Sequence, residues 1–268
     1  MPSRTIDQYP ISYAEAGDGA PLLLVHGTLG DQRVFDPQMA ALGAAHHVMA
    51  LSMRHCWPGS WPDEGGDFTI DRHVADVAGF IRALERGPVA LLGHSRGGHI
   101  AFRVAERHPE LVRALILAEP GGELDTSLGG AQASGQQAAG FSAAAARIAA
   151  GDIEGGLILV AELTGGPGAW DKRPEARKAV SRDNARSLLG QVAENRSPYS
   201  RAAAEGIQAP NLLLGGDSSQ PNFAKILDAL EHAMPNTRRV TIPHATHGLN
   251  QDNPAAFNQA VLEFLTGR

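Results

Sequence analysis

The chain has 268 residues, of which 43% are hydrophobic and 19% charged, ordinary values for a globular protein that can bury a sizeable core. Its formal net charge is −6 and it has no long basic run, so neither nucleic acid nor an anionic membrane is an expected partner. The N-terminus has no apolar signal region, no stretch is long enough to cross a bilayer, and the single cysteine, Cys56, excludes an internal disulfide, so we expect a cytoplasmic protein.

The first 87 residues alternate between short apolar runs and helical patterns. A weak alternation over 5–16 predicts an N-terminal hairpin, and the continuous apolar run 21–25 is typical of a strand covered on both faces. The further expected elements are a helix at 34–42, a strand at 47–51 and a helix from 71 to 84. This succession predicts right-handed βαβ crossovers and a mostly parallel, doubly wound sheet.

A strand, a turn and a helix follow one another around Ser95. The apolar run 89–92 meets the sequence G-H-S-R-G at 93–97, and a helical pattern begins at once. A serine at such a sharp turn has strained backbone angles, and only small residues fit two positions to either side, where Gly93 and Gly97 stand. The turn exposes a hydroxyl beside the free N–H groups of a helix. The segment closely resembles the nucleophile elbow of the α/β-hydrolases, which implies that Ser95 is a nucleophile.

Strand signals stop after the apolar run 114–118 and resume only at residue 211. The part between them is rich in Ala, Gly and Arg, and helical patterns cover 141–150, 157–163 and 174–190. Because a structureless loop of about 80 residues is improbable, we interpret this part as a helical lid. The domain prediction is an α/β core formed by 1–122 and 207–268, with the lid inserted at 123–206. The last expected elements are a strand at 211–214, a helix at 222–234, a strand at 239–242 and an amphipathic C-terminal helix.

A serine nucleophile needs a base, because an isolated hydroxyl reacts poorly. In this family the base is a histidine on the loop between the last strand and the last helix, and His247 holds that place. His244 lies close by, and we interpret it as a loop residue.

The acid that orients the histidine has two candidates. The usual family position, after the strand at 211–214, is occupied by Ser219, with Asp217 two residues early. A minority of the superfamily, including zearalenone-type lactonases and some haloalkane dehalogenases, carries the acid at the end of the strand after the elbow helix. Glu119 stands there, and a carboxylate that closes an apolar strand is costly without a partner. We therefore favour Glu119, with Asp217 as the alternative.

The same resemblance places the oxyanion hole at the backbone N–H groups of Thr28 and Arg96. No metal or organic cofactor is expected: Asp71, His73 and Asp76 are interpreted as a helix cap and two outer-face residues. Cys56 is interpreted as an incidental thiol.

The loop 55–61, which contains two of the three tryptophans, and the lid are expected to wall the pocket. The function that the resemblance implies is a serine hydrolase that cleaves a small-molecule carboxylic ester or lactone with a Ser-His-Glu triad. Carbon–carbon bond hydrolysis, peroxyacid chemistry and a ligand receptor derived from a hydrolase remain open alternatives.

Overall fold

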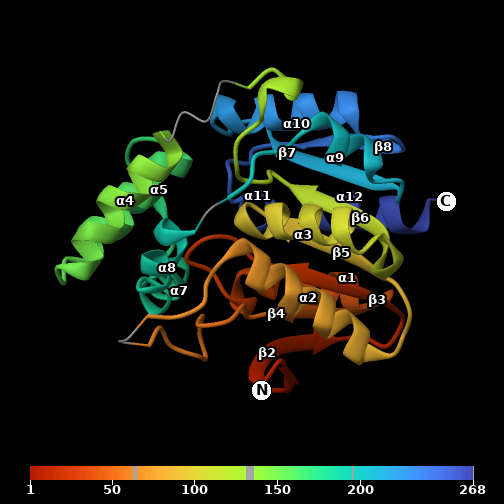
Figure 1. Ribbon diagram of the computed structural model, residues 1–268, viewed down its shortest axis with the longest axis horizontal. Coiled ribbons are helices and arrows are strands. Elements are labelled where there is room, and N and C mark those ends of the chain that lie inside the picture. The colour runs from red at the N-terminus through yellow and green to blue at the C-terminus, as the bar shows by residue number, and fades with distance from the viewer. Residues whose placement is uncertain (63–64, 131–135, 195, 268) are drawn as a thin grey trace.

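A computed structural model describes residues 1–62, 65–130, 136–194 and 196–267 (Figure 1). Within them, eight strands form one sheet in the spatial order β1-β2-β4-β3-β5-β6-β7-β8. The strands are β1 (Ser3–Ile6), β2 (Tyr9–Ala16), β3 (Ala20–Val25), β4 (His46–Leu51), β5 (Val89–His94), β6 (Val112–Ala118), β7 (Asn211–Gly216) and β8 (Thr237–Ile242). The pairs β1–β2 and β2–β4 are antiparallel, and the others are parallel. The predicted N-terminal hairpin and the mostly parallel sheet are confirmed.

Helices cover both faces of the sheet. On one face lie α2 (Ile70–Leu84), α3 (Arg96–Arg107), α9 (Arg201–Gly206) and α10 (Pro221–Ala233), and on the other lie α1 (Asp36–Gly43), α11 (Leu249–Asp252) and α12 (Pro254–Thr266). Neighbouring residues of one strand enter different cores: Leu23 packs under the first set of helices and Leu24 under the second. Both are fully buried, which explains why apolar residues fill consecutive positions of the central strands, as at 22–25 and 89–92.

A further group of helices lies between β6 and β7 in the chain. These inserted helices are α4 (Gln136–Ala149), α5 (Ile153–Gly165), α6 (Ala169–Lys172), α7 (Glu175–Asp183) and α8 (Ser187–Ala193). They bury a core of their own that includes Phe141, Leu157 and Leu188, and Leu29 from the loop after β3 packs into it. Figure 1 shows them grouped at one end of the sheet, apart from the helices that cover its faces.

The division into a core domain and a lid over 123–206 stays a proposal. Residues 131–135 and 195 of that range lie outside the described residues. At its C-terminal end, Tyr199 and Ala204 pack with the core under α2 and α3. In the part of the chain described here, no helix is both long and apolar enough to cross a membrane.

One expected helix is divided into two. The pattern 174–190 predicted a single helix, but α7 ends at Asp183 and α8 begins at Ser187. Asn184, between them, is buried: its amide donates to Asp31 Oδ2 at 2.6 Å and accepts from the Trp57 N–H at 2.8 Å. These contacts hold the helix break against the loops of the core.

The outer-face interpretation of two residues on α2 is wrong. His73 is fully buried and Asp76 is 1% exposed, because the loop after β4 and helix α3 cover that side of α2. Asp76 binds the guanidinium of Arg54 at 2.8 Å, and the Nδ1 of His73 accepts from Arg96 at 2.8 Å. Burial and the nearby Arg96 charge hold the pKa of His73 well below its ordinary value, so this imidazole is a neutral acceptor.

Candidate active site

The turn between β5 and α3 has the strained geometry expected of an elbow. Ser95 has φ 55° and ψ −121°, and its N–H donates to the Ala118 carbonyl at 3.0 Å. A Cβ built on Gly93 would lie 2.2 Å from the Gly97 carbonyl oxygen, and one on Gly97 would lie 2.2 Å from the carbonyl oxygen of Val25. Only glycine fits at these two positions, since the atoms met are backbone. The strain therefore serves to hold the serine hydroxyl at the carboxyl end of the sheet.

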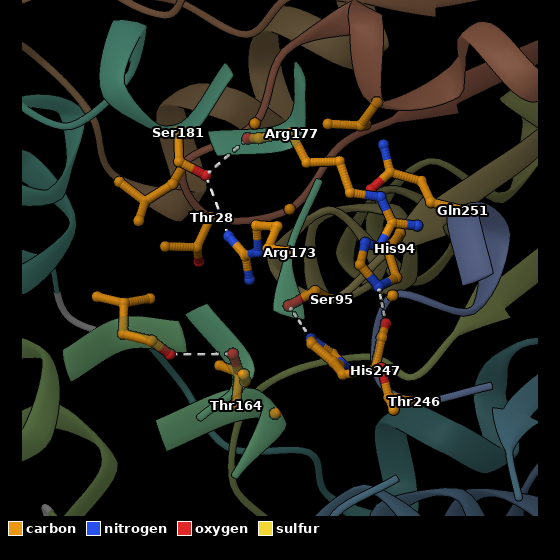
Figure 2. Close-up of a pocket in the computed structure, with 18 of the residues that line it drawn as sticks. Thr28, His94, Ser95, Thr164, Arg173, Arg177, Ser181, Thr246, His247 and Gln251 are labelled. Carbon is orange, nitrogen blue, oxygen red and sulfur yellow. Dashed lines mark hydrogen bonds between the residues drawn. The ribbon is translucent and has the colours of Figure 1, made fainter. Parts of the chain in front are cut away.

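Three side chains from three separate loops form one line of hydrogen bonds. The Ser95 Oγ lies 3.0 Å from His247 Nε2, and His247 Nδ1 lies 2.7 Å from Glu119 Oε2 (Figure 2 shows the first contact). The Nδ1–H donates to the carboxylate, so Nε2 is left free to accept the hydroxyl proton. Chemically, an imidazole placed in this way can take the proton of a serine hydroxyl.

Glu119 is held in place by the backbone around it. It follows β6 with φ 42°, its N–H donates to the Leu214 carbonyl at 2.9 Å, and it is 1% exposed. Its second carboxylate oxygen, Oε1, accepts from the Gly216 N–H at 2.8 Å. The carboxylate thus has one oxygen fixed by β7 and the other on the His247 imidazole.

Asp217 contacts the backbone of the loop that carries His247. Its carboxylate accepts from the backbone N–H groups of His244 and Ala245 at 2.9 and 3.2 Å. The hydrogen bond from the His244 N–H is the main cause that lowers the pKa of the Asp217 carboxyl. Asp217 therefore anchors the start of the loop that carries His247, while His244 itself is exposed on that loop.

Two aromatic side chains that the sequence reasoning did not single out hold the His247 residue. Phe223, near the start of α10, stacks on its ring with centroids 3.9 Å apart and planes inclined by 10°. His94 donates from Nε2 to the His247 carbonyl at 2.7 Å. Burial, together with the His247 ring, lowers the pKa of His94 to about 3, so its imidazole remains a neutral donor. A position next to the serine was the only sequence signal for His94, and Phe223 had none.

The loop after β3 lies beside the serine. Thr28 lines the same cavity as Ser95, and a Cβ on Gly27 would lie 2.8 Å from the Ser95 Cβ. His26 fixes this loop: its Nδ1 lies 2.8 Å from the Gly27 carbonyl oxygen, and its Nε2 accepts the Met53 N–H at 3.0 Å. The Arg96 N–H opens α3 directly after the serine.

A cavity of about 620 Å³ opens over the Ser95 hydroxyl (Figure 2). The inserted helices supply much of its wall, including Phe141, Val160 and Arg177. The loop 55–61 was expected to wall the cavity as well, but the described lining contains none of its residues. That loop packs elsewhere: Cys56 is 3% exposed, and burial raises the pKa of its thiol to about 12.

The Arg96 side chain connects the start of α3 to the end of the inserted helices. Its guanidinium binds the Glu194 carboxylate at 2.5 Å, and both side chains are under 5% exposed. It also donates to the Phe68 carbonyl at 2.9 Å, and Arg196 binds the other side of the Glu194 carboxylate at 2.6 Å. Sequence reasoning considered only the backbone of Arg96 and missed this buried pair.

Comparisons with known proteins agree with this architecture. The profile of the Alpha/beta hydrolase family matches residues 22–260. The 2-(acetamidomethylene)succinate hydrolase of Mesorhizobium japonicum is 26% identical over 98% of this chain and 95% of its own length. The (E)-2-((N-methylformamido)methylene)succinate hydrolase of Acinetobacter baylyi is 26% identical over 94% of this chain and 93% of its own length.

Solved structures resemble the fold over nearly the whole chain. The enol-lactonase of Burkholderia xenovorans has a TM-score of 0.83 at 19% identity, covering 99% of this chain and 100% of its own. An esterase of Thermogutta terrifontis has a TM-score of 0.79 at 22% identity, covering 99% of this chain and 97% of its own. At these identities the likeness shows the fold alone.

Proposed function

The chain belongs to the alpha/beta hydrolase family and is a hydrolase, and on this premise we propose that it cleaves a carboxylic ester or lactone through an acyl-enzyme. The observation that carries the proposal is the continuous line from Ser95 Oγ through the His247 imidazole to the Glu119 carboxylate. Such a line activates a serine toward carbonyl carbon and needs no further cofactor.

The proposed reaction has two halves. In the first, His247 Nε2 takes the hydroxyl proton while Ser95 Oγ attacks the carbonyl, and the protonated imidazole then gives that proton to the departing alkoxide. In the second, the same nitrogen deprotonates a water that attacks the acyl-enzyme, the bond between the acyl carbon and Ser95 Oγ breaks to release the acid, and the imidazole returns the proton to Ser95 Oγ. Glu119 keeps the imidazole in the required tautomer throughout.

The negative oxygen of both tetrahedral intermediates is proposed to rest on the backbone N–H groups of Thr28 and Arg96. Their place beside the nucleophile supports this: Thr28 lines the cavity and the Arg96 N–H opens α3. Thr28→Ala leaves its N–H in place and should change the rate little, whereas Thr28→Pro removes the donor and should lower kcat by about 10²- to 10³-fold.

The direct test combines labelling and turnover. A fluorophosphonate should add to Ser95 alone, located by mass spectrometry of the digested protein, and 4-nitrophenyl butyrate should be hydrolysed by the wild type. Ser95→Ala should abolish both while the melting temperature is retained. Absence of labelling, or turnover that survives in Ser95→Ala, would refute the assignment.

A second candidate is that the group attacked is an amide. Two curated relatives that align with nearly the whole chain are named as hydrolases of methylene-succinates that carry an acetamido or an N-methylformamido group. The same serine and imidazole would serve, with the proton delivered to nitrogen. Supplying 2-(acetamidomethylene)succinate and 4-nitrophenyl butyrate to one enzyme preparation decides between them, because the true substrate class should have a kcat/KM at least about 100-fold higher.

A further inference from the structure

The wall of the cavity carries more positive than negative side chains. Among the described lining residues the basic ones are Lys172, Arg173, Arg177 and Arg196, whereas the acidic one is Asp252. Lys172 is exposed to solvent, whereas the three arginines are half-buried. Some of these positive charges are neutralised by carboxylates of the protein itself.

Two of the arginines have carboxylate partners. Arg177 Nη1 binds Asp252 Oδ1 at 2.8 Å, and Arg196 Nη2 binds Glu194 Oε1 at 2.6 Å. The other oxygen of Asp252, Oδ2, accepts from both the N–H and the hydroxyl of Thr246, so the described contacts of this carboxylate are with Arg177 and Thr246. Arg177 and Arg196 are therefore structural parts of the wall.

Arg173 is different. It lies between α6 and α7, and its Nη1 donates to the neutral hydroxyl of Ser181 at 3.1 Å, while Trp170 lies 5.5 Å from its Cζ. No carboxylate of the described residues lies within ion-pair distance of its guanidinium. Four of its five N–H donors are thus left for another acceptor.

The surroundings make this charge expensive unless an anion binds. Burial lowers the pKa of Arg173, the neighbouring Arg177 charge lowers it further, and Asp252 opposes them, yet a guanidinium stays protonated in proteins. Figure 2 shows its guanidinium pointing into the cavity that Ser95 and Thr28 line. A half-buried cation aimed at the reaction site fits a planar anion of the substrate.

We propose that Arg173 is a specificity-determining residue that binds a free carboxylate of the substrate, so that the natural ester or lactone also carries a carboxylic acid. The inference rests on the proposed ester or lactone cleavage and narrows its substrate class. A carboxylate is favoured because its two oxygens match the fork of the guanidinium.

The experiment compares esters that differ only in a terminal carboxylate. One pair, mono-4-nitrophenyl adipate and 4-nitrophenyl hexanoate, has the charge on the acyl side. The other, 5-acetoxypentanoate and pentyl acetate, has it on the alcohol side. Rates are corrected for spontaneous hydrolysis, and each is measured for the wild type, Arg173→Gln, Arg173→Lys and Lys172→Gln. Lys172→Gln is the matched control, because it removes an adjacent positive charge from the same wall.

The wild type should prefer the charged ester in at least one pair. Arg173→Gln should lower kcat/KM for that ester by about 10- to 100-fold, mostly through KM, and leave the uncharged ester within about twofold. Arg173→Lys should recover part of the loss, and Lys172→Gln should have little effect.

Equal rates within both pairs, or an equal loss in Lys172→Gln and Arg173→Gln, would overturn the proposal. A loss that affects charged and uncharged esters alike would do so too, because it would indicate a structural role. Failure to hydrolyse any of the four esters would instead contradict the proposed function.

Discussion

Replacing Glu119 by Gln tests the least orthodox part of the site. The carboxylate makes two contacts: Oε2 accepts from His247 Nδ1 at 2.7 Å, and Oε1 accepts from the Gly216 N–H at 2.8 Å. A glutamine has one oxygen and one NH₂ group. The Gly216 N–H requires the amide oxygen as its acceptor, so the NH₂ group of the glutamine faces His247 Nδ1. Nδ1 must then accept a hydrogen bond, and the proton of the neutral imidazole moves to Nε2. That tautomer cannot accept the proton of Ser95.

Loss of the productive tautomer costs about 10⁴-fold in kcat in serine hydrolases, which corresponds to about 5.4 kcal/mol of transition-state stabilisation. We expect this loss for Glu119→Gln in a steady-state assay with 4-nitrophenyl butyrate, with fluorophosphonate labelling of Ser95 slowed in parallel. Asp217→Asn is the control: its carboxylate contacts backbone N–H groups and not the imidazole, so kcat should fall less than about 10-fold. A nearly active Glu119→Gln beside an inactive Asp217→Asn would refute the reasoning.

Three further predictions concern stability and reactivity. Gly97→Ala places a methyl group 2.2 Å from the Val25 carbonyl oxygen and should lower the free energy of unfolding by about 3 kcal/mol or more. Gly206→Ala is the control, because its Cβ meets nothing within 4 Å. Equal shifts of the two variants in urea titrations would contradict this prediction. The pKa of His94 is about 3 in the folded protein and about 6.5 in the unfolded chain, so its contribution to stability is complete above pH 6.5 and is lost as the pH falls toward 3. His94→Gln should therefore reduce the slope of the unfolding free energy against pH by up to about 1.4 kcal/mol per pH unit between pH 3 and 6.5. An unchanged slope would rule the effect out. Cys56, buried and with its thiol pKa raised to about 12, should resist iodoacetamide at pH 8 until urea unfolds the chain, and rapid labelling of the native protein would show the burial to be wrong.

The parts of the fold and site that depend on neighbouring residues could be predicted from the sequence. The elbow at Ser95 is local, because the steric demand of the turn is expressed in glycines two positions away. The central strands could be predicted because both faces of the sheet are buried there, and runs such as 22–25 and 89–92 are apolar throughout. The choice of Glu119 as the acid came from a resemblance to the minority of the superfamily that carries the acid at the end of this strand, and its 2.7 Å contact with His247 agrees with that choice.

What could not be predicted depends on contacts between distant segments. His73 and Asp76 were misplaced because helical spacing does not report that a loop and a second helix cover the polar side of α2. The break at Asn184 follows from a partner on the loop after β3, more than 150 positions away. The Arg173 guanidinium is notable only because the other two arginines of the wall, Arg177 and Arg196, have carboxylate partners, which no sequence pattern reveals.

The buried pair between Arg96 and Glu194 restricts how this scaffold can be recombined. A chimera that receives the inserted helices of a relative, and with them a neutral residue at position 194, would leave the buried Arg96 guanidinium without this counter-charge, at a cost of about 3 to 5 kcal/mol. The inserted helices can therefore be exchanged between relatives only if both residues of the pair are transferred, or if Arg96 is replaced by a neutral residue in the recipient.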